Sequence, residues 1–423
     1  MRKVILGLTV LAAMSAFSVF AQPPQGPPAG RGGRGPQPPV EIDKTPPVED
    51  FKPSALNQAG KQYPEVNSQR RVRTRFMAPT AQTVLLDIGG VKYPMTKGED
   101  GAWIGVSNAQ DEGFHYYQLN VDGVSVPDPG AVMFYGASRW GSGVEVPAQD
   151  ADFYAVKNVP HGQLREVHFF SKSANATLRC YVYTPPDYET GSKRYPVLYL
   201  QHGAGEDEHG WGGQGHAGFI MDNLIAAGKA KPFIIVIGNS YIPGAPAFGR
   251  GPAPAAPAGA PAAAGAPPAG APGRGPGGPG GRGGMNFTAF ENVLIDDMIP
   301  YIDATFRTIA NQPHRAMAGL SMGGMQTRVI ALAHLDKFSY IGIFSGGSIA
   351  MTDVKDPADF KKKVKVVFVS YGSRENGAAG KTNVEALKQA GIDSVFYESP
   401  QTAHEWMSWR RSLYQFAPLL FQK

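Results

Sequence analysis

The stretch that decides the fold is residues 315–325, Arg315-Ala-Met-Ala-Gly-Leu-Ser-Met-Gly-Gly-Met325. Its first four residues can form a buried strand, and a helix is expected from about Gly324. The G-x-S-x-G sequence between them, residues 319–323, permits a sharp strand-to-helix turn that presents the Ser321 hydroxyl at the carboxyl edge of a sheet. A tight turn without chemistry is the alternative, because a chain with 53 glycines can match this motif by chance.

Outward from this turn, strands alternate with helices from about His161 to the end of the chain. Apolar runs predicted as strands are residues 167–170, 178–184, 197–201, 233–238, 315–318, 340–344, 364–370 and 394–397. The segments between them have helical periodicity, as in residues 290–306 before the fifth strand. This alternation predicts an α/β fold, with a mostly parallel sheet covered by helices on both faces. The order is that of an α/β-hydrolase.

A serine hydroxyl is a weak nucleophile and needs a base within hydrogen-bonding distance. Among nine histidines, His404 fits best because it follows the last predicted strand and precedes the final helix, where this fold brings a histidine beside the serine. The alternative is a helix-capping or surface histidine. We therefore expect His404 to act as the general base for Ser321.

A third residue must orient the histidine, and in this fold it lies between the serine and the histidine in sequence, after the penultimate strand. The predicted strand 364–370 is followed by Tyr371-Gly-Ser-Arg-Glu375. Glu375 is therefore the expected acid. Arg374 and Glu375 could equally form an exposed turn pair, and Asp393 is a rival carboxylate.

An oxyanion that develops beside the nucleophile also requires two fixed donors. In this fold one donor is the backbone N–H after the nucleophile, which belongs to Met322, and the other comes from a loop after an early strand. The loop 202–205 follows the predicted strand 197–201, and Ala204 N–H is the expected second donor.

Three histidines in one loop region, His202, His209 and His216, allow a different interpretation as a metal cluster with Glu206 and Asp207. Their spacing fits no common zinc signature, and a glycine-rich loop would hold the ligands with little rigidity. We expect neither a metal nor another cofactor.

The amino-terminal part of the chain has a different organisation. Arg2 and Lys3 precede the apolar residues 4–20, which predicts a signal peptide at residues 1–21 and a secreted or periplasmic product without a membrane anchor. Residues 22–62 are rich in Pro, Gly and Gln, and residues 243–284 consist almost entirely of Pro, Ala, Gly and Arg, which predicts a disordered leader and a disordered insertion. Between them, short alternating runs separated by turns predict a β-sandwich over residues 63–150, followed by the α/β domain over 151–423.

Composition limits the possible partners. The net charge is +5 and the sequence pI about 9.0, but no basic stripe interleaved with aromatic residues is present, so nucleic-acid binding is not expected. The single cysteine, Cys180, excludes an intramolecular disulfide and is expected in the core. Nothing in the sequence indicates the oligomeric state.

From about residue 161 to the end, the chain resembles the esterase D-like family, especially the carbohydrate esterases that include feruloyl and acetylxylan esterases. The matching pieces are Tyr199-Leu-Gln-His202-Gly-Ala-Gly205 with Trp211, Met221-Asp-Asn-Leu-Ile225, Lys231-Pro-Phe-Ile-Ile-Val236, residues 319–324, and His404-Glu-Trp406 with Trp409. Residues 63–150 resemble early-set, immunoglobulin-like domains through Gly101-Ala-Trp103, Gly113-Phe-His-Tyr116-Tyr117, Val121-Asp-Gly123 and Asp128-Pro129.

This resemblance implies an exported serine esterase that acts on esters of plant cell-wall polysaccharides or oligosaccharides, with hydroxycinnamoyl (feruloyl) esters favoured. It also implies that Trp211 and Trp406 wall the acyl pocket, although core positions are the alternative for both. Acetylxylan esters, siderophore esters and thioesters compete as substrates. A non-catalytic carbohydrate-binding protein with the same fold is the alternative from another class.

Overall fold

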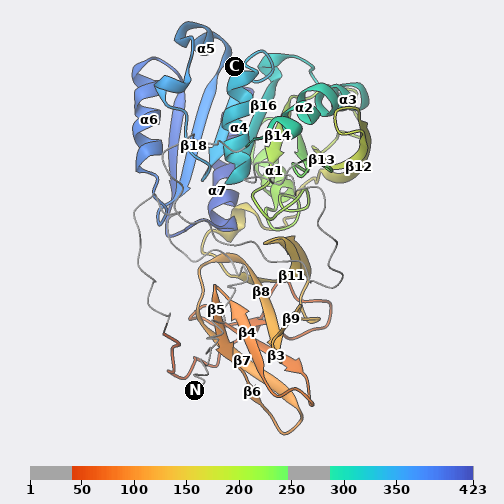
Figure 1. The fold of residues 1–423 in the computed structure, drawn as a ribbon, viewed down its shortest axis with the longest axis vertical. Coiled ribbons are helices and arrows are strands. Elements are labelled where there is room, and N and C mark those ends of the chain that lie inside the picture. The colour runs from red at the N-terminus through yellow and green to blue at the C-terminus, as the bar shows by residue number, and fades with distance from the viewer. Residues whose placement is uncertain (1–40, 246–285, 423) are drawn as a thin grey trace, which may run out of the picture. The chain divides into compact units, whose positions relative to one another are not determined.

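The computed structural model describes residues 41–245 and 286–422 (Figure 1). By their contacts the chain divides into two compact units, Met1–Gln149 and Asp150–Lys423. The predicted signal peptide 1–21, the first part of the predicted leader 22–62 and nearly all of the predicted insertion 243–284 lie outside the described residues.

The described residues of the first unit form strands and no α-helix. The strands are β1 Lys52–Pro53, β2 Glu65–Val66, β3 Arg71–Met77, β4 Val84–Ile88, β5 Val91–Pro94, β6 Thr96–Lys97, β7 Ala102–Ala109, β8 Gly113–Val121, β9 Val124–Val126, β10 Met133–Gly136 and β11 Arg139–Val146. One sheet has the order β1-β2-β3-β7-β6 and the other β10-β11-β8-β4-β5, with β9 paired to β8. Buried side chains of both sheets form one cluster that includes Val72, Trp103, Leu86 and Tyr117.

The predicted leader extends too far along the chain. Residues 41–62 take part in the β-rich unit, because Lys52 and Pro53 pair with β2 and Asn57 forms a bridge with Ala131. The low apolar content of the predicted leader indicated that it would not pack against the rest of the chain. Its backbone instead uses the hydrogen-bonding edge that a neighbouring strand supplies.

The second unit contains an eight-stranded sheet. Its strands are β12 Gln163–Ser171, β13 Ala176–Thr184, β14 Val197–Gln201, β15 Ile234–Gly238, β16 Arg315–Leu320, β17 Tyr340–Phe344, β18 Val366–Gly372 and β19 Ser394–Ser399. The spatial order is β12-β13-β15-β14-β16-β17-β18-β19. The pairs β12–β13 and β13–β15 are antiparallel and the other five are parallel. Each of the eight predicted strands is present, and the expected mostly parallel sheet is confirmed.

Helices cover both faces of this sheet (Figure 1). They are α1 Ala217–Ala226, α2 Thr288–Asn292, a π-helical segment Val293–Met298, α3 Ile299–Thr305, α4 Met322–Ala333, α5 Pro357–Lys363, α6 Ala378–Gln389 and α7 Trp406–Phe416. Short 3-10 turns occupy Ala151–Phe153, Gln312–His314, Met351–Asp353 and Ala417–Leu419.

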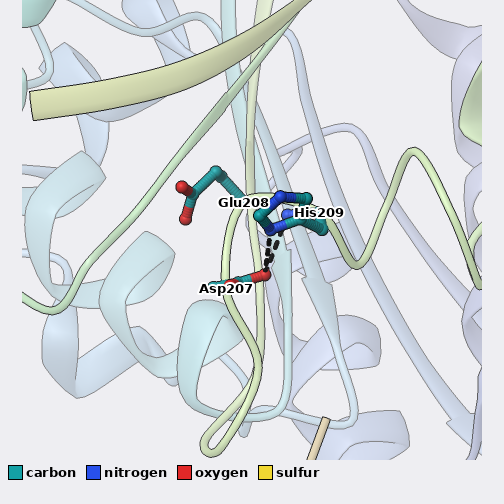
Figure 2. Close-up of side chains that lie close together, drawn as sticks. All are labelled: Asp207, Glu208 and His209. Carbon is teal, nitrogen blue, oxygen red and sulfur yellow. Dashed lines mark hydrogen bonds and ion pairs between the residues drawn. The ribbon is translucent and has the colours of Figure 1, made fainter. Parts of the chain in front are cut away.

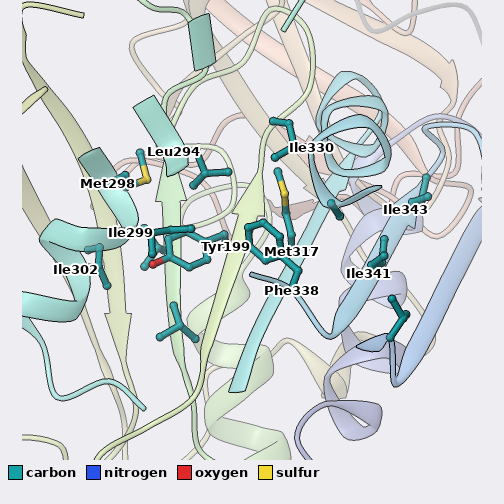
Figure 3. Close-up of a cluster of buried hydrophobic side chains, with 14 of the residues drawn as sticks. Tyr199, Leu294, Met298, Ile299, Ile302, Met317, Ile330, Phe338, Ile341 and Ile343 are labelled. Atoms are coloured by element: carbon teal, nitrogen blue, oxygen red, sulfur yellow. The ribbon is translucent and has the colours of Figure 1, made fainter. Parts of the chain in front are cut away.

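Alternate residues of each strand face the two helical layers, as the period of two requires. Tyr199, Met317 and Ile341 contact the layer that contains Leu294 and Ile330 (Figure 3). On the other face, Phe416 of α7 packs against Phe344 and Phe368. Because the strands β14 to β19 are parallel, they end together at one carboxyl edge, where the loops that carry polar residues begin.

Two further expectations concern single features. Cys180 is fully buried and unpaired, as predicted, and burial raises the pKa of its thiol to about 12. Of the helices that the structure describes, none is long and apolar enough to cross a membrane.

Candidate active site

Ser321 lies between β16 and α4 with φ 51° and ψ −114°, a backbone conformation that side-chain-bearing residues rarely adopt. The turn closes tightly around it: a Cβ on Gly323 would lie 2.6 Å from His202 O, and one on Gly319 would lie 2.5 Å from Gly323 C. Such strain costs on the order of 1–3 kcal/mol and persists where the surrounding structure enforces it. The glycines of the motif therefore allow the turn that presents Ser321.

His404 lies beside this serine. It lies between the end of β19 and Glu405, the residue before α7, and its Nε2 is 2.9 Å from Ser321 Oγ. The side chain is 23% exposed, so a ligand can reach the pair. The rings of Trp409 and His404 are perpendicular, with centroids 5.1 Å apart, and this contact limits rotation of the imidazole.

Glu375 completes the chain of hydrogen bonds. Its Oε1 is 2.8 Å from His404 Nδ1, while Oε2 accepts from Ser345 Oγ and from Gly372 N, each at 2.7 Å. Burial raises the pKa of Glu375, but the bond and charge of His404, with the donors Ser345 and Gly372, outweigh it, so the pKa lies below its ordinary value. The ionised carboxylate accepts the Nδ1–H, which leaves Nε2 free to accept the serine proton.

The rival Asp393 is in a different place. It directly precedes Ser394, the first residue of β19, and its carbonyl accepts the Val367 N–H near the start of β18. Asp393 and Val367 therefore lie at the edge of the sheet where the parallel strands begin, opposite the edge that carries Ser321. The structure therefore brings Glu375, and not Asp393, to the histidine.

Ser345 is a member of the site that the sequence analysis missed. It is the first residue after β17, has φ 50°, and links Glu375 to Trp409 by donating to the carboxylate and accepting the indole N–H at 3.2 Å. The available signal was its position, because a small polar residue directly after a parallel strand lies at the same carboxyl edge as the nucleophile.

Both segments that carry the predicted oxyanion donors lie next to Ser321. Met322 is the first residue of α4, and the N–H groups of a first helical turn have no partner within the helix. A Cβ on Gly203 would lie 3.5 Å from Ser321 Cβ, so the loop containing Ala204 runs directly beside the nucleophile. Ala204 itself is exposed.

The substrate-binding prediction for Trp211 and Trp406 is wrong, and the alternative of core positions holds. Trp211 is 0% and Trp406 2% exposed, and the rings meet edge-on at 5.5 Å. The Trp211 indole donates to Gln201 O at 2.9 Å. Neither ring offers a free face to a ligand, because each fills space that the neighbouring glycines leave open: a Cβ on Gly215 would lie 2.8 Å from Trp211, and one on Gly210 3.2 Å from Trp406.

The three histidines considered as metal ligands do not converge among the described residues. His202 is buried, with Nδ1 bound to Gly203 O and Nε2 accepting from Ser240 N, and His216 lies at the start of α1. Within residues 41–245 and 286–422, a group of potential ligand atoms exists only at Asp207, Glu208 and His209 (Figure 2). Its members already have partners, since Asp207 binds His209 at 2.9 Å and Glu208 binds Arg179 at 2.6 Å.

Comparison with known proteins agrees with this geometry. The Esterase family model matches residues 171–241 and 280–420. The chain belongs to the Esterase family. The match includes the serine turn, the acid and the histidine, so the three residues that the structure brings together all fall in the family's part of the chain.

Relatives of this Esterase family member include larger proteins. The chain is 42% identical over 392 residues to an endo-1,4-beta-xylanase/feruloyl esterase of Xylanibacter ruminicola, covering 90% of this chain and 49% of that protein. It is 23% identical over 283 residues to endo-1,4-beta-xylanase Y of Acetivibrio thermocellus, covering 59% and 22%. The chain thus spans half or less of these relatives. The enterobactin esterase of Shigella flexneri has the same fold, with a TM-score of 0.53, 12% identity and coverage of 83% and 93%.

Proposed function

We propose that this protein is a serine carboxylic-ester hydrolase with an α/β-hydrolase domain, and that Ser321 forms its acyl-enzyme. The observation that carries the proposal is the continuous chain from Ser321 Oγ through His404 to Glu375, with distances of 2.9 and 2.8 Å. This arrangement supplies a nucleophile, a base and an orienting carboxylate in reach of one another.

The reaction follows from the positions of these groups. Ser321 Oγ bonds to the ester carbonyl carbon as its proton passes to His404 Nε2, and Glu375 stabilises the resulting imidazolium. The N–H groups of Met322 and Ala204 face the oxygen that becomes negative. His404 then protonates the departing alcohol, and water repeats the sequence on the acyl-enzyme to release the acid and restore Ser321.

The substrate class that we propose is a hydroxycinnamoyl ester on plant cell-wall polysaccharide. The name of the 42% identical relative includes feruloyl esterase, and the predicted signal peptide suits a polymer that cannot enter the cell. Because Trp211 and Trp406 are buried, they do not support a hydroxycinnamoyl substrate. An exposed aromatic residue near the site is Tyr241, which is 41% exposed and whose hydroxyl contacts Gly205 in the loop beside Ser321.

The β-rich unit is proposed to be an early-set, immunoglobulin-like domain that accompanies the esterase domain. The second unit, Asp150–Lys423, is shorter than the 392 residues over which the match to the Xylanibacter ruminicola protein extends. The match therefore includes much of the first unit as well. A shared accessory unit supports a common polymeric substrate.

Hydrolysis of three esters tests the proposal. We expect the purified protein to hydrolyse methyl ferulate with a higher kcat/KM than acetylated xylan. It should also hydrolyse p-nitrophenyl acetate, which serves as a general control. All three activities should be lost in Ser321→Ala. A preference for acetylated xylan would favour the acetylxylan esterase alternative. No turnover of any ester would favour a non-catalytic carbohydrate-binding protein.

A further inference from the structure

The loop beside Ser321 is a β-turn whose third residue requires glycine. Glu206 N–H donates to Gly203 O at 3.3 Å, and Gly205 has φ 78°. A positive φ at the third position is the mark of a type II turn. Ala204 is the second residue of this turn, and within the part of the chain that the structure describes no acceptor takes its N–H.

The N–H groups on either side of Ala204 are both occupied by side chains. Gly203 N donates to Glu206 Oε2 at 3.1 Å, and Gly205 N donates to the Tyr241 hydroxyl at 2.7 Å. Glu206 therefore closes the turn twice, once through its backbone and once through its carboxyl group. Of three consecutive N–H groups, only that of Ala204 remains for a ligand.

Both side chains are themselves held in place. Glu206 is 6% exposed and also accepts the indole N–H of Trp406. The Tyr241 ring stacks on His202, with centroids 5.6 Å apart and an interplanar angle of 28°. His202 in turn accepts the Ser240 N–H at 3.0 Å, so the segment after β15 and the loop after β14 are joined by two consecutive residues.

We infer that Glu206 and Tyr241 are positioning residues that hold Ala204 N–H as the second oxyanion donor, an inference that rests on the proposed function. Each acts through its neighbour's N–H and neither touches the reacting atoms. Without Tyr241 Oη, Gly205 N–H loses the acceptor that fixes the third residue of the turn. Without Glu206, the turn that fixes Ala204 loses one of its two closing bonds.

Removal of a single hydroxyl group tests this inference. We expect Tyr241→Phe to lower kcat for methyl ferulate by about 10-fold to 100-fold with little change in KM, because loss of a whole oxyanion donor costs about 10²–10³ in kcat. Glu206→Gln should act in the same direction. Tyr301→Phe is the matched control, since Tyr301 also loses one hydroxyl hydrogen bond, at 3.3 Å to His168 O on β12.

Binding constants of the variants for two ligands distinguish a positioning role of Glu206 and Tyr241 from a merely structural one. If the two residues position the donor, a boronic acid that forms a tetrahedral adduct on Ser321 should bind Tyr241→Phe more weakly by the factor lost in kcat, whereas the affinity for ferulate should be unchanged. Equal losses for both ligands, or wild-type kcat in both variants, would overturn the inference.

Labelling with a fluorophosphonate separates this inference from the proposed function. In that reaction a bond forms from Ser321 Oγ to phosphorus, fluoride leaves, the serine proton passes to His404, and the phosphonyl oxygen occupies the oxyanion position. Slower labelling of Tyr241→Phe than of Tyr301→Phe supports the inference even if the wild-type protein hydrolyses none of the three esters. Equal labelling rates contradict it.

Discussion

The hydrolytic trio Ser321, His404 and Glu375 and the tryptophan cluster Trp211, Trp406 and Trp409 lie at the same edge of the sheet but differ in what they offer to a ligand. The trio is linked by hydrogen bonds and partly exposed. The tryptophans meet edge-on at 5.5 and 5.3 Å and are at most 6% exposed. The large rings fill the space that the glycines of the nearby loop leave, whereas Tyr241, whose hydroxyl contacts the same loop, is 41% exposed.

The largest effect in this comparison is expected for the nucleophile. Ser321→Ala should reduce kcat by about 10⁴-fold to 10⁶-fold, the scale on which such enzymes lose activity without their serine. The free energy of unfolding should not fall, because the hydroxyl supports no packing and the strained backbone stays. Steady-state kinetics and thermal melting measure both. Full activity in this variant would end the assignment of the trio.

The next effect separates the two carboxylates. Glu375→Gln should lower kcat by about 10²-fold to 10⁴-fold, since an amide no longer stabilises the imidazolium and can favour the wrong tautomer. Asp393→Asn is the matched control and should leave kcat unchanged, because Asp393 lies at the opposite edge of the sheet. The reverse pattern of activities would show that the histidine has another partner.

Substitutions in the tryptophan cluster should change the stability of the protein and leave its preference between ester substrates unchanged. Trp211→Ala should lower the free energy of unfolding by about 3–5 kcal/mol, because it leaves a large cavity in the core. The ratio of kcat/KM for methyl ferulate and p-nitrophenyl acetate should stay constant, and Trp211→Phe, a milder change, should show the same constancy. Trp140→Ala, at a ring that is 53% exposed, is the control for loss of a surface tryptophan. A changed ratio in Trp211→Phe would return Trp211 to the acyl pocket.

The parts of the molecule that follow from local pattern could be predicted from the sequence. Buried parallel strands are nearly continuous apolar runs and the antiparallel strands β12 and β13 contain shorter ones, so the positions of all eight strands could be identified. Chain order at the carboxyl edge then placed Ser321, Glu375 and His404 in succession. These steps need only the period of a strand and the connectivity of the sheet.

The remaining features depend on contacts between distant segments. Whether Trp211 faces a ligand is decided by Trp406, nearly 200 residues later, and the role of Glu206 depends on Trp406 and on the turn it closes. The bond from Tyr241 to Gly205 joins two loops. Residues 41–62 gain order from strands elsewhere in the unit. Side-chain direction in loops is set by such packing and not by spacing.

The smallest of the expected effects concerns the carboxyl group that links the two regions. Burial raises the pKa of Glu206 to about 8; the Gly203 N–H lowers it, the nearby Asp207 raises it and the Trp406 N–H lowers it. In the unfolded chain a glutamate titrates near 4.3. Between these values the folded protein keeps a proton that the unfolded chain releases, so the stability that Glu206 contributes is present below pH 4.3 and is lost as the pH rises to 8.

A comparison with Glu206→Gln, which does not titrate, isolates this effect. Relative to the variant, the wild-type protein should lose about 2 kcal/mol of unfolding free energy between pH 6 and pH 8, because one pKa unit corresponds to about 1.4 kcal/mol. Urea unfolding at the two pH values gives the difference. The exposed Glu385 on α6 provides the control, since Glu385→Gln removes a carboxylate without burial and should show no such pH dependence. A wild-type to Glu206→Gln difference that is the same at both pH values would mean that Glu206 is ionised throughout, and the turn beside Ser321 would then carry a full negative charge next to its oxyanion donor.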